Sequence, residues 1–93
     1  MKLISDETLF REALENVLDY IAMDSLERAI DFNRELENRI DSIPHMPFKY
    51  RKSIHFNDDN IRDYIFKGYT IPYIIDTQKN EIIILDIFKW VDK

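Results

Sequence analysis

Basic and aromatic side chains that could bind phosphate or an acidic protein gather in the second half of the chain. Residues 44 to 57 contain three bases and no acid, and two of the bases further along complete the set. The set consists of Lys49, Arg51, Lys52, Arg62 and Lys89, interspersed with Tyr50, Tyr64, Tyr69 and Trp90. Charge-assisted hydrogen bonds and ring stacking would let such a group hold a phosphate or an acidic partner. Taken singly, these residues are equally typical of packing aromatics and solubilising charges, and both interpretations stay open. Trp90 is the stronger candidate for a partner contact, because a Trp beyond the last strand often packs over the sheet or binds a partner.

Other site chemistries find little support in the sequence. Two histidines, His45 and His55, and no cysteine do not make a metal ligand set, so neither a metal nor a cofactor is expected. A single glycine, Gly68, cannot build a phosphate-binding loop. The adjacent acids Asp58 and Asp59 sit in an Asn-rich stretch typical of a turn rather than of acid–base catalysis.

Length and charge restrict the class of protein. Ninety-three residues with 45% hydrophobic content predict one globular domain over residues 1–93. The net charge of −5 argues against coating nucleic acid or an anionic membrane through the overall field. The absence of cysteine, an acidic N-terminus and the lack of a long apolar run lead us to expect a cytoplasmic protein.

The first half of the chain predicts two helices. Apolar residues recur at helical spacing over residues 6–22, and Ser5 is the expected N-cap, with acids in the first turn. Asp24 is the expected cap of a second helix that ends before Pro44. The apolar set expected for the second helix is Leu26, Ala29, Ile30, Leu36, Ile40 and Ile43. The short connection predicts an antiparallel αα-hairpin whose apolar face packs on a sheet.

The second half predicts an antiparallel sheet. Strands are expected at 50–56, 61–67, 69–75 and 81–88, separated by polar turns at 57–60 and 77–80, and a short edge strand at residues 1–4 would join them. Gly68 marks a position where a bulge or a positive φ is tolerated. Pro72 lacks a ladder donor, so its strand needs a bulge or an edge there. The predicted fold is α+β, an αα-hairpin on a three-strand C-terminal meander.

The order of elements and several segments resemble the bacterial RelE/ParE superfamily of type II toxins. The resemblance covers nearly the whole chain, through LENVLDYIAMDSLERAIDFNRELENRIDSI, PFKYRKSI, NIRDYIFKGYTIPYIID and IIILDIFKW. The block IRD-x-x-F-x-GY-x-I-x-Y and the ending I-F-K-W are more similar to the ParE-like branch than to RelE. This resemblance implies a toxin that a cognate antitoxin neutralises, with a helix or extended segment of the antitoxin over the groove and sheet.

The two branches imply different targets. ParE-like toxins poison DNA gyrase, whereas RelE-like toxins cut messenger RNA on the ribosome with concentrated bases and a C-terminal Tyr or His. Arg62 falls at the superfamily's sheet arginine, but Thr70 stands where Arg is frequent and Lys89 where His is common. We therefore expect a non-enzymatic toxin that binds a protein target, with gyrase as the expected one.

The contact residues expected for that target are Arg51, Lys52, Arg62, Lys89 and Trp90. The alternatives are a ribosome-dependent messenger RNA endoribonuclease that uses Arg51, Lys52, Arg62 and Lys89, and a toxin-like binding module without toxicity.

Overall fold

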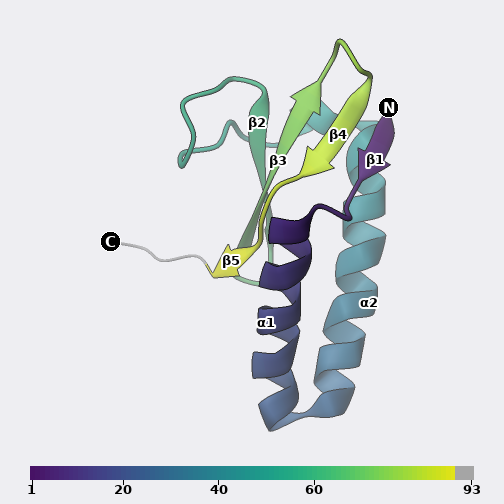
Figure 1. Cartoon of the computed structure of the whole chain (residues 1–93), viewed down its shortest axis with the longest axis vertical. Helices are drawn as coiled ribbons and strands as arrows, with labels where there is room; N and C mark the ends of the chain where they lie inside the picture. The colour runs from purple at the N-terminus through teal and green to yellow at the C-terminus, as the bar shows by residue number, and fades with distance from the viewer. Residues whose placement is uncertain (90–93) are drawn as a thin grey trace.

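The computed structural model describes residues 1–89, in which an antiparallel pair of helices packs on a five-stranded sheet (Figure 1). The helices are α1 (Thr8–Asp24) and α2 (Leu26–Ser42), and two 3₁₀ turns, Ile43–His45 and Pro47–Lys49, follow α2. The hairpin extends well beyond one end of the sheet (Figure 1). No helix within residues 1–89 has both the length and the apolar character to cross a bilayer. The predicted α+β fold with its αα-hairpin is confirmed.

Ser25 alone connects the two helices. Its backbone N–H donates to the Ile21 carbonyl at the end of α1, and its Oγ accepts from the Arg28 N–H, 3.2 Å away, at the start of α2. The prediction of Asp24 as the cap was therefore wrong, because α1 runs on through Asp24 and one extended residue serves both helix ends.

The start of α1 also differs from the prediction. The expected N-cap Ser5 lies before the helix, which begins at Thr8 with Glu7 in the N-cap position, and Glu7 makes no side-chain capping bond. The first turn accordingly holds no acid. Strand β1 (Lys2–Ile4) pairs with β4, and residues 5–7 connect that strand to the first turn of the helix.

The sheet is mixed. Its remaining strands are β2 (Ile61–Phe66), β3 (Tyr69–Asp76), β4 (Glu81–Ile84) and β5 (Phe88–Lys89), in the order β1-β4-β3-β2 with β5 also on β3. The predicted meander β2-β3-β4 is antiparallel, whereas the expected N-terminal strand pairs parallel to β4. A parallel pair requires a long crossover. Here both helices and β2–β3 lie between the two strands in sequence.

Gly68 sits in the tight turn between β2 and β3. Phe66 pairs with Tyr69, so Lys67 and Gly68 form a two-residue loop with φ of 49° and 84°. Two consecutive positive φ values match the right-handed twist of a hairpin. The positive φ expected at Gly68 is confirmed.

Pro72 interrupts the pairing of β3 with the last part of the chain. The Pro72 carbonyl accepts from the Leu85 N–H, 2.9 Å away, but proline has no N–H to return, and the β3–β4 ladder ends at Tyr73–Ile84. Pairing resumes at Thr70–Phe88. Between these two pairs, β3 advances by three residues, from 73 to 70, whereas the opposite segment advances by four, from 84 to 88. The opposite segment therefore contains one extra residue, which is a β-bulge. The expected bulge is confirmed, and the predicted single strand 81–88 is split.

The strand predicted at 50–56 was wrong. This segment makes one isolated bridge, Lys52 with Arg62, and bends away afterwards. The turn before β2 does form as expected, because the Asp58 Oδ1 accepts from the Asn60 N–H at 2.8 Å. Residues 50–60 are therefore a loop that touches the edge of β2 rather than a strand of the sheet.

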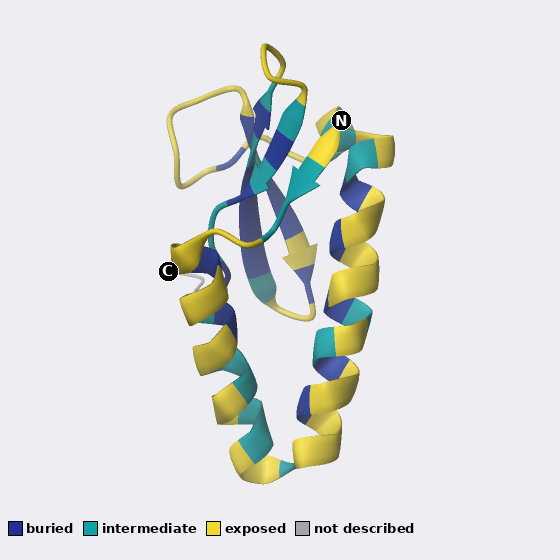
Figure 2. Ribbon diagram, turned by 45° about the vertical axis from the view of Figure 1, so that its right-hand side comes forward, coloured by how far each residue is buried: buried dark blue, intermediate teal, exposed yellow. Residues whose placement is uncertain are grey.

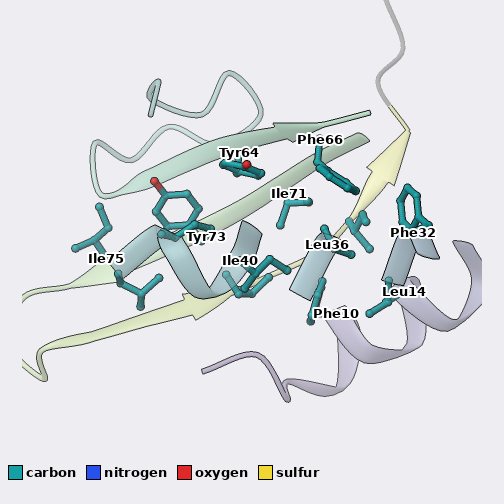
Figure 3. Close-up of a cluster of buried hydrophobic side chains, with 14 residues drawn as sticks. Phe10, Leu14, Phe32, Leu36, Ile40, Tyr64, Phe66, Ile71, Tyr73 and Ile75 are labelled. Carbon is teal, nitrogen blue, oxygen red and sulfur yellow. The ribbon is translucent and has the colours of Figure 1, made fainter. Parts of the chain in front are cut away.

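The core lies between the helices and the sheet (Figures 2 and 3). Strand alternation places Ile71, Tyr73 and Ile75 on the helix side, each at most 1% exposed, where they pack with Leu36 and Ile40 of α2. The set of apolar residues predicted for α2 was partly wrong. Leu26 and Ile30 are 67% and 55% exposed, whereas Phe32, which was not predicted, is buried and lies edge-on to Phe66.

Replacing Leu36 should show how far stability depends on this contact. Because Leu36 is fully buried, Leu36→Ala should lower the free energy of unfolding by about 2–5 kcal/mol through lost burial and a cavity. The matched control is Leu26→Ala on the same helix, expected within about 0.5 kcal/mol of wild type. Urea unfolding followed by circular dichroism measures both, and equal effects would contradict the assigned core.

Candidate functional site

Arg62 ties the loop before β2 to the sheet. Its Nη1 donates to the carbonyls of Phe48 and Tyr50 at 3.2 and 3.0 Å, and its Nε donates to the Asp59 carbonyl at 3.3 Å. The guanidinium also lies 5.2 Å from the centre of the Phe48 ring. A planar guanidinium suits such divergent acceptors. Most of its donors are therefore occupied within the protein.

The two neighbouring bases are also paired with acids. Arg51 Nη2 lies 3.6 Å from Oδ2 of Asp63, whose side chain is completely buried, and Lys52 Nζ lies 3.3 Å from Oδ1 of Asp59. The Lys52 pair is exposed on both sides and contributes little to stability. Three of the predicted site residues, Arg51, Lys52 and Arg62, thus lie together around the loop.

The tyrosines near this loop are packing residues. The Tyr50 ring lies 4.9 Å from that of Tyr64, edge to face, and both belong to the core or contact it. The Tyr73 hydroxyl donates to the Pro47 carbonyl at 2.5 Å. Burial, with a smaller contribution from nearby Tyr50, raises the pKa of Tyr73 well above its usual range, so the hydroxyl remains a donor. The packing interpretation holds for Tyr50 and Tyr64.

Lys89 lies at the other end of the sheet from Arg62. Lys89 pairs with Tyr69 of β3, and Tyr69 pairs with Phe66 of β2. Phe66 lies four residues along β2 from Arg62, which is about 13 Å at about 3.3 Å per residue. The predicted basic surface is therefore two separate regions. The alternation of the strands places Tyr69 on the helix side, where its ring is edge-on to Phe32.

A cleft lies between Lys89 and the distal part of the helical hairpin. Its volume is about 470 Å³, and we call it the Lys89 cleft. The residues that line it are Tyr20, Ile21, Arg28, Asp31, Phe32, Lys67, Tyr69 and Lys89. Aromatic walls with several cations suit an acidic or aromatic segment of a partner.

Two of the cations in the Lys89 cleft are already neutralised. Lys67 Nζ lies 2.8 Å from Oε2 of Glu35, and its hydrogen bond holds the pKa of Glu35 below the usual range. Arg28 pairs with Asp24 at 2.5 Å. Within residues 1–89, no carboxylate lies within ion-pair distance of Lys89. Lys89 is thus the base in this cleft best placed to meet an acidic ligand.

Sequence reasoning missed several residues of this cleft. The sequence pattern indicated only that Tyr20 belongs to an amphipathic helix and that Lys67 lies beside a turn. The spacing of these residues along the chain does not connect them to Lys89. Only the packing of the β2–β3 turn and β5 against the hairpin brings them together. Trp90, the fifth predicted contact residue, lies outside the described residues. Across residues 1–89, no three His, Asp or Glu side chains converge as metal ligands.

Fold and site together define a small α+β protein, an αα-hairpin on a mixed sheet with basic side chains placed at both ends of that sheet. The sequence matches the family described as the ParE toxin of the type II toxin–antitoxin system parDE, over residues 7–89. The chain therefore belongs to the ParE toxin family, and the resemblance seen in its sequence is confirmed.

The solved structures include one with a closely similar fold. It is described as the chromosomal ParDE toxin–antitoxin system from P. aeruginosa, with a TM-score of 0.77 and 15% sequence identity. The match covers 98% of this chain and 97% of that one, and at this identity it shows the fold alone. A comparison with curated protein sequences gives no match.

Removing the Arg62 guanidinium should loosen the loop before β2. In Arg62→Met the apolar stem can stay over Phe48, but the hydrogen bonds to three carbonyls are lost, and we expect a destabilisation of about 1–3 kcal/mol. Amides of residues 48–59 should exchange faster by hydrogen-exchange mass spectrometry. Arg34→Met, which removes an exposed helix pair, is the control, and unchanged exchange in the loop would contradict the anchoring role of Arg62.

Proposed function

We propose that this protein arrests bacterial growth by binding a protein target, with DNA gyrase as the first candidate, and that a cognate antitoxin neutralises it. The proposal starts from membership of the ParE toxin family. It places the protein in the cytoplasm, where both partners would meet it. The observation that carries the choice of mechanism is the distribution of the basic side chains.

RNA cleavage requires several groups to converge on one phosphodiester. A general base, a general acid and cations must all reach the same few atoms. In this chain the donors of Arg62 are directed at backbone carbonyls, Lys89 lies on β5 at the other end of the sheet, and Thr70 is fully buried. This separation favours a binding surface over a ribonuclease site, and the endoribonuclease remains the alternative.

The contacts proposed for the target follow from the same distribution. Lys89 and the Lys89 cleft would take an acidic segment at one end, and the half-exposed Arg51 and Lys52 would add charge at the other. Arg62 would act chiefly by holding the loop that carries Arg51 and Lys52. Trp90, next to Lys89 in sequence, stays in the proposed contact set.

Expression of the chain alone tests the mechanism. We expect growth arrest, relief on co-expression of the neighbouring antitoxin gene, and accumulation of cleaved DNA complexes when the purified protein meets purified gyrase. Messenger RNA cut at ribosome-bound codons would contradict the proposal in favour of the endoribonuclease. Absence of any growth effect would favour a non-toxic binding module.

Lys89 provides a sharper test of the contact surface. Lys89→Ala should weaken target binding about tenfold, because the cation best placed to meet an acidic ligand is lost from the cleft. Lys79→Ala, in the turn between β3 and β4, is the matched control and should bind as wild type does. Binding to immobilised gyrase, with folding checked by circular dichroism, measures both. Equal binding by the two variants would remove Lys89 from the contact set.

A further inference from the structure

An apolar pocket of about 460 Å³ lies where the start of α1, the loop before β2 and the end of β4 meet. Its walls are formed by Leu9 from the start of α1, Phe56 from the loop before β2, Ile83 of β4 and Leu85, which directly follows β4. We call it the Leu9 pocket. Leu9 is 62% and Phe56 42% exposed, although the neighbours Phe10, Ile82 and Ile84 are buried in the core. Its size lies in the range of about 300–1,000 Å³ usual for binding pockets.

The rim of the Leu9 pocket is acidic. Glu7 and Asp86 lie at its edge, and no Lys, Arg or His of residues 1–89 lines it. Glu7 occupies the N-cap position of α1 but makes no side-chain bond to the helix. Asp86 accepts one hydrogen bond, from the Ile87 N–H at 2.8 Å, through Oδ1. Two carboxylates beside exposed apolar walls favour a ligand that has both an apolar side chain and a positive charge.

The geometry points to a docking site for a partner segment in which a large apolar side chain is flanked by Lys or Arg. The apolar side chain would fill the space between Leu9, Ile83 and Leu85, and the flanking bases would reach Glu7 and Asp86. The charge of the rim selects this occupant over an acidic segment, because like charges at the edge of an apolar site oppose binding.

This site differs in charge from the Lys89 cleft. The Lys89 cleft is lined by Arg28, Lys67 and Lys89 together with Asp31, whereas the charged residues of the Leu9 pocket are both carboxylates. Arg28 and Lys67 are already paired with Asp24 and Glu35, so Lys89 is the cation that would oppose a basic segment in the cleft, and Glu7 and Asp86 would oppose an acidic segment in the pocket. The protein can therefore hold two partners of opposite charge, or one partner whose two segments differ in charge, and this inference does not depend on the identity of the toxin target.

A pair of short peptides tests the inference without any assay of toxicity. The probe is acetyl-Gly-Lys-Leu-Phe-Lys-Gly-amide, and the control probe replaces both lysines by glutamate. In a titration followed by ¹H–¹⁵N NMR, the basic peptide should shift the amides of Leu9, Ile83 and Leu85 and should weaken as salt is raised. The acidic peptide should leave them unchanged. Shifts of the same size with both peptides, or shifts at the Lys89 cleft instead, would overturn the proposal.

Variants separate the roles of the wall and the rim. Leu9→Lys should lower the affinity for the basic peptide at least about tenfold, whereas Leu26→Lys, at a similarly exposed leucine of α2, should leave that affinity unchanged. Glu7→Gln with Asp86→Asn should remove most of the salt dependence, and Glu12→Gln is its control. An unaffected Leu9→Lys variant would contradict the site. Sedimentation that shows a dimer disrupted by Leu9→Lys would assign the pocket to a second copy and overturn the basic partner.

Discussion

The burial of one face of β3 is the constraint on which the rest of the structure depends. β3 pairs with β2, β4 and β5, and its helix-facing residues Ile71, Tyr73 and Ile75 are almost completely inaccessible. Because side chains alternate along a strand, a shift of one residue would turn this whole set outward. Burying these side chains against α2 therefore sets the register of the sheet, and the register decides which strand side chains face solvent.

The surface consequences are most visible in the charges. The bases predicted to contact a target lie in two regions of this acidic chain, because the length of β2 separates the loop of Arg51 and Lys52 from Lys89. Arg62 and Asp63, neighbours in β2, point to opposite faces, and each engages the same loop from its own side. A loop held at two faces can present charge without being part of the sheet. The Leu9 pocket, with its carboxylate rim, completes a surface suited to partners of unlike charge.

Local sequence signals predicted those features that a few neighbouring residues control. The helical spacing of apolar residues, the positive φ at Gly68 and the turn at Asp58–Asn60 depend on short-range sterics and hydrogen bonds. The errors arose where segments compete for partners. Residues 50–56 have strand composition, yet they make only the bridge from Lys52, and Leu26 and Ile30 fit a helical apolar stripe but are 67% and 55% exposed. Whether a segment becomes a strand, or an apolar side chain is buried, depends on which other segment of the folded chain packs against it.

The sequence by itself determined the two helices, the turns of the sheet, the interruption at Pro72 and membership of the ParE toxin family, because these depend on residue type and short-range order. Only the tertiary structure decided which basic side chains are bonded within the protein and where the Lys89 cleft and the Leu9 pocket form. Arg62 donates to the Phe48 carbonyl, and Lys89 and Tyr20 line the same cleft. Both arrangements join segments that are distant in the chain. Strand register and helix packing set those contacts, and no local spacing encodes them.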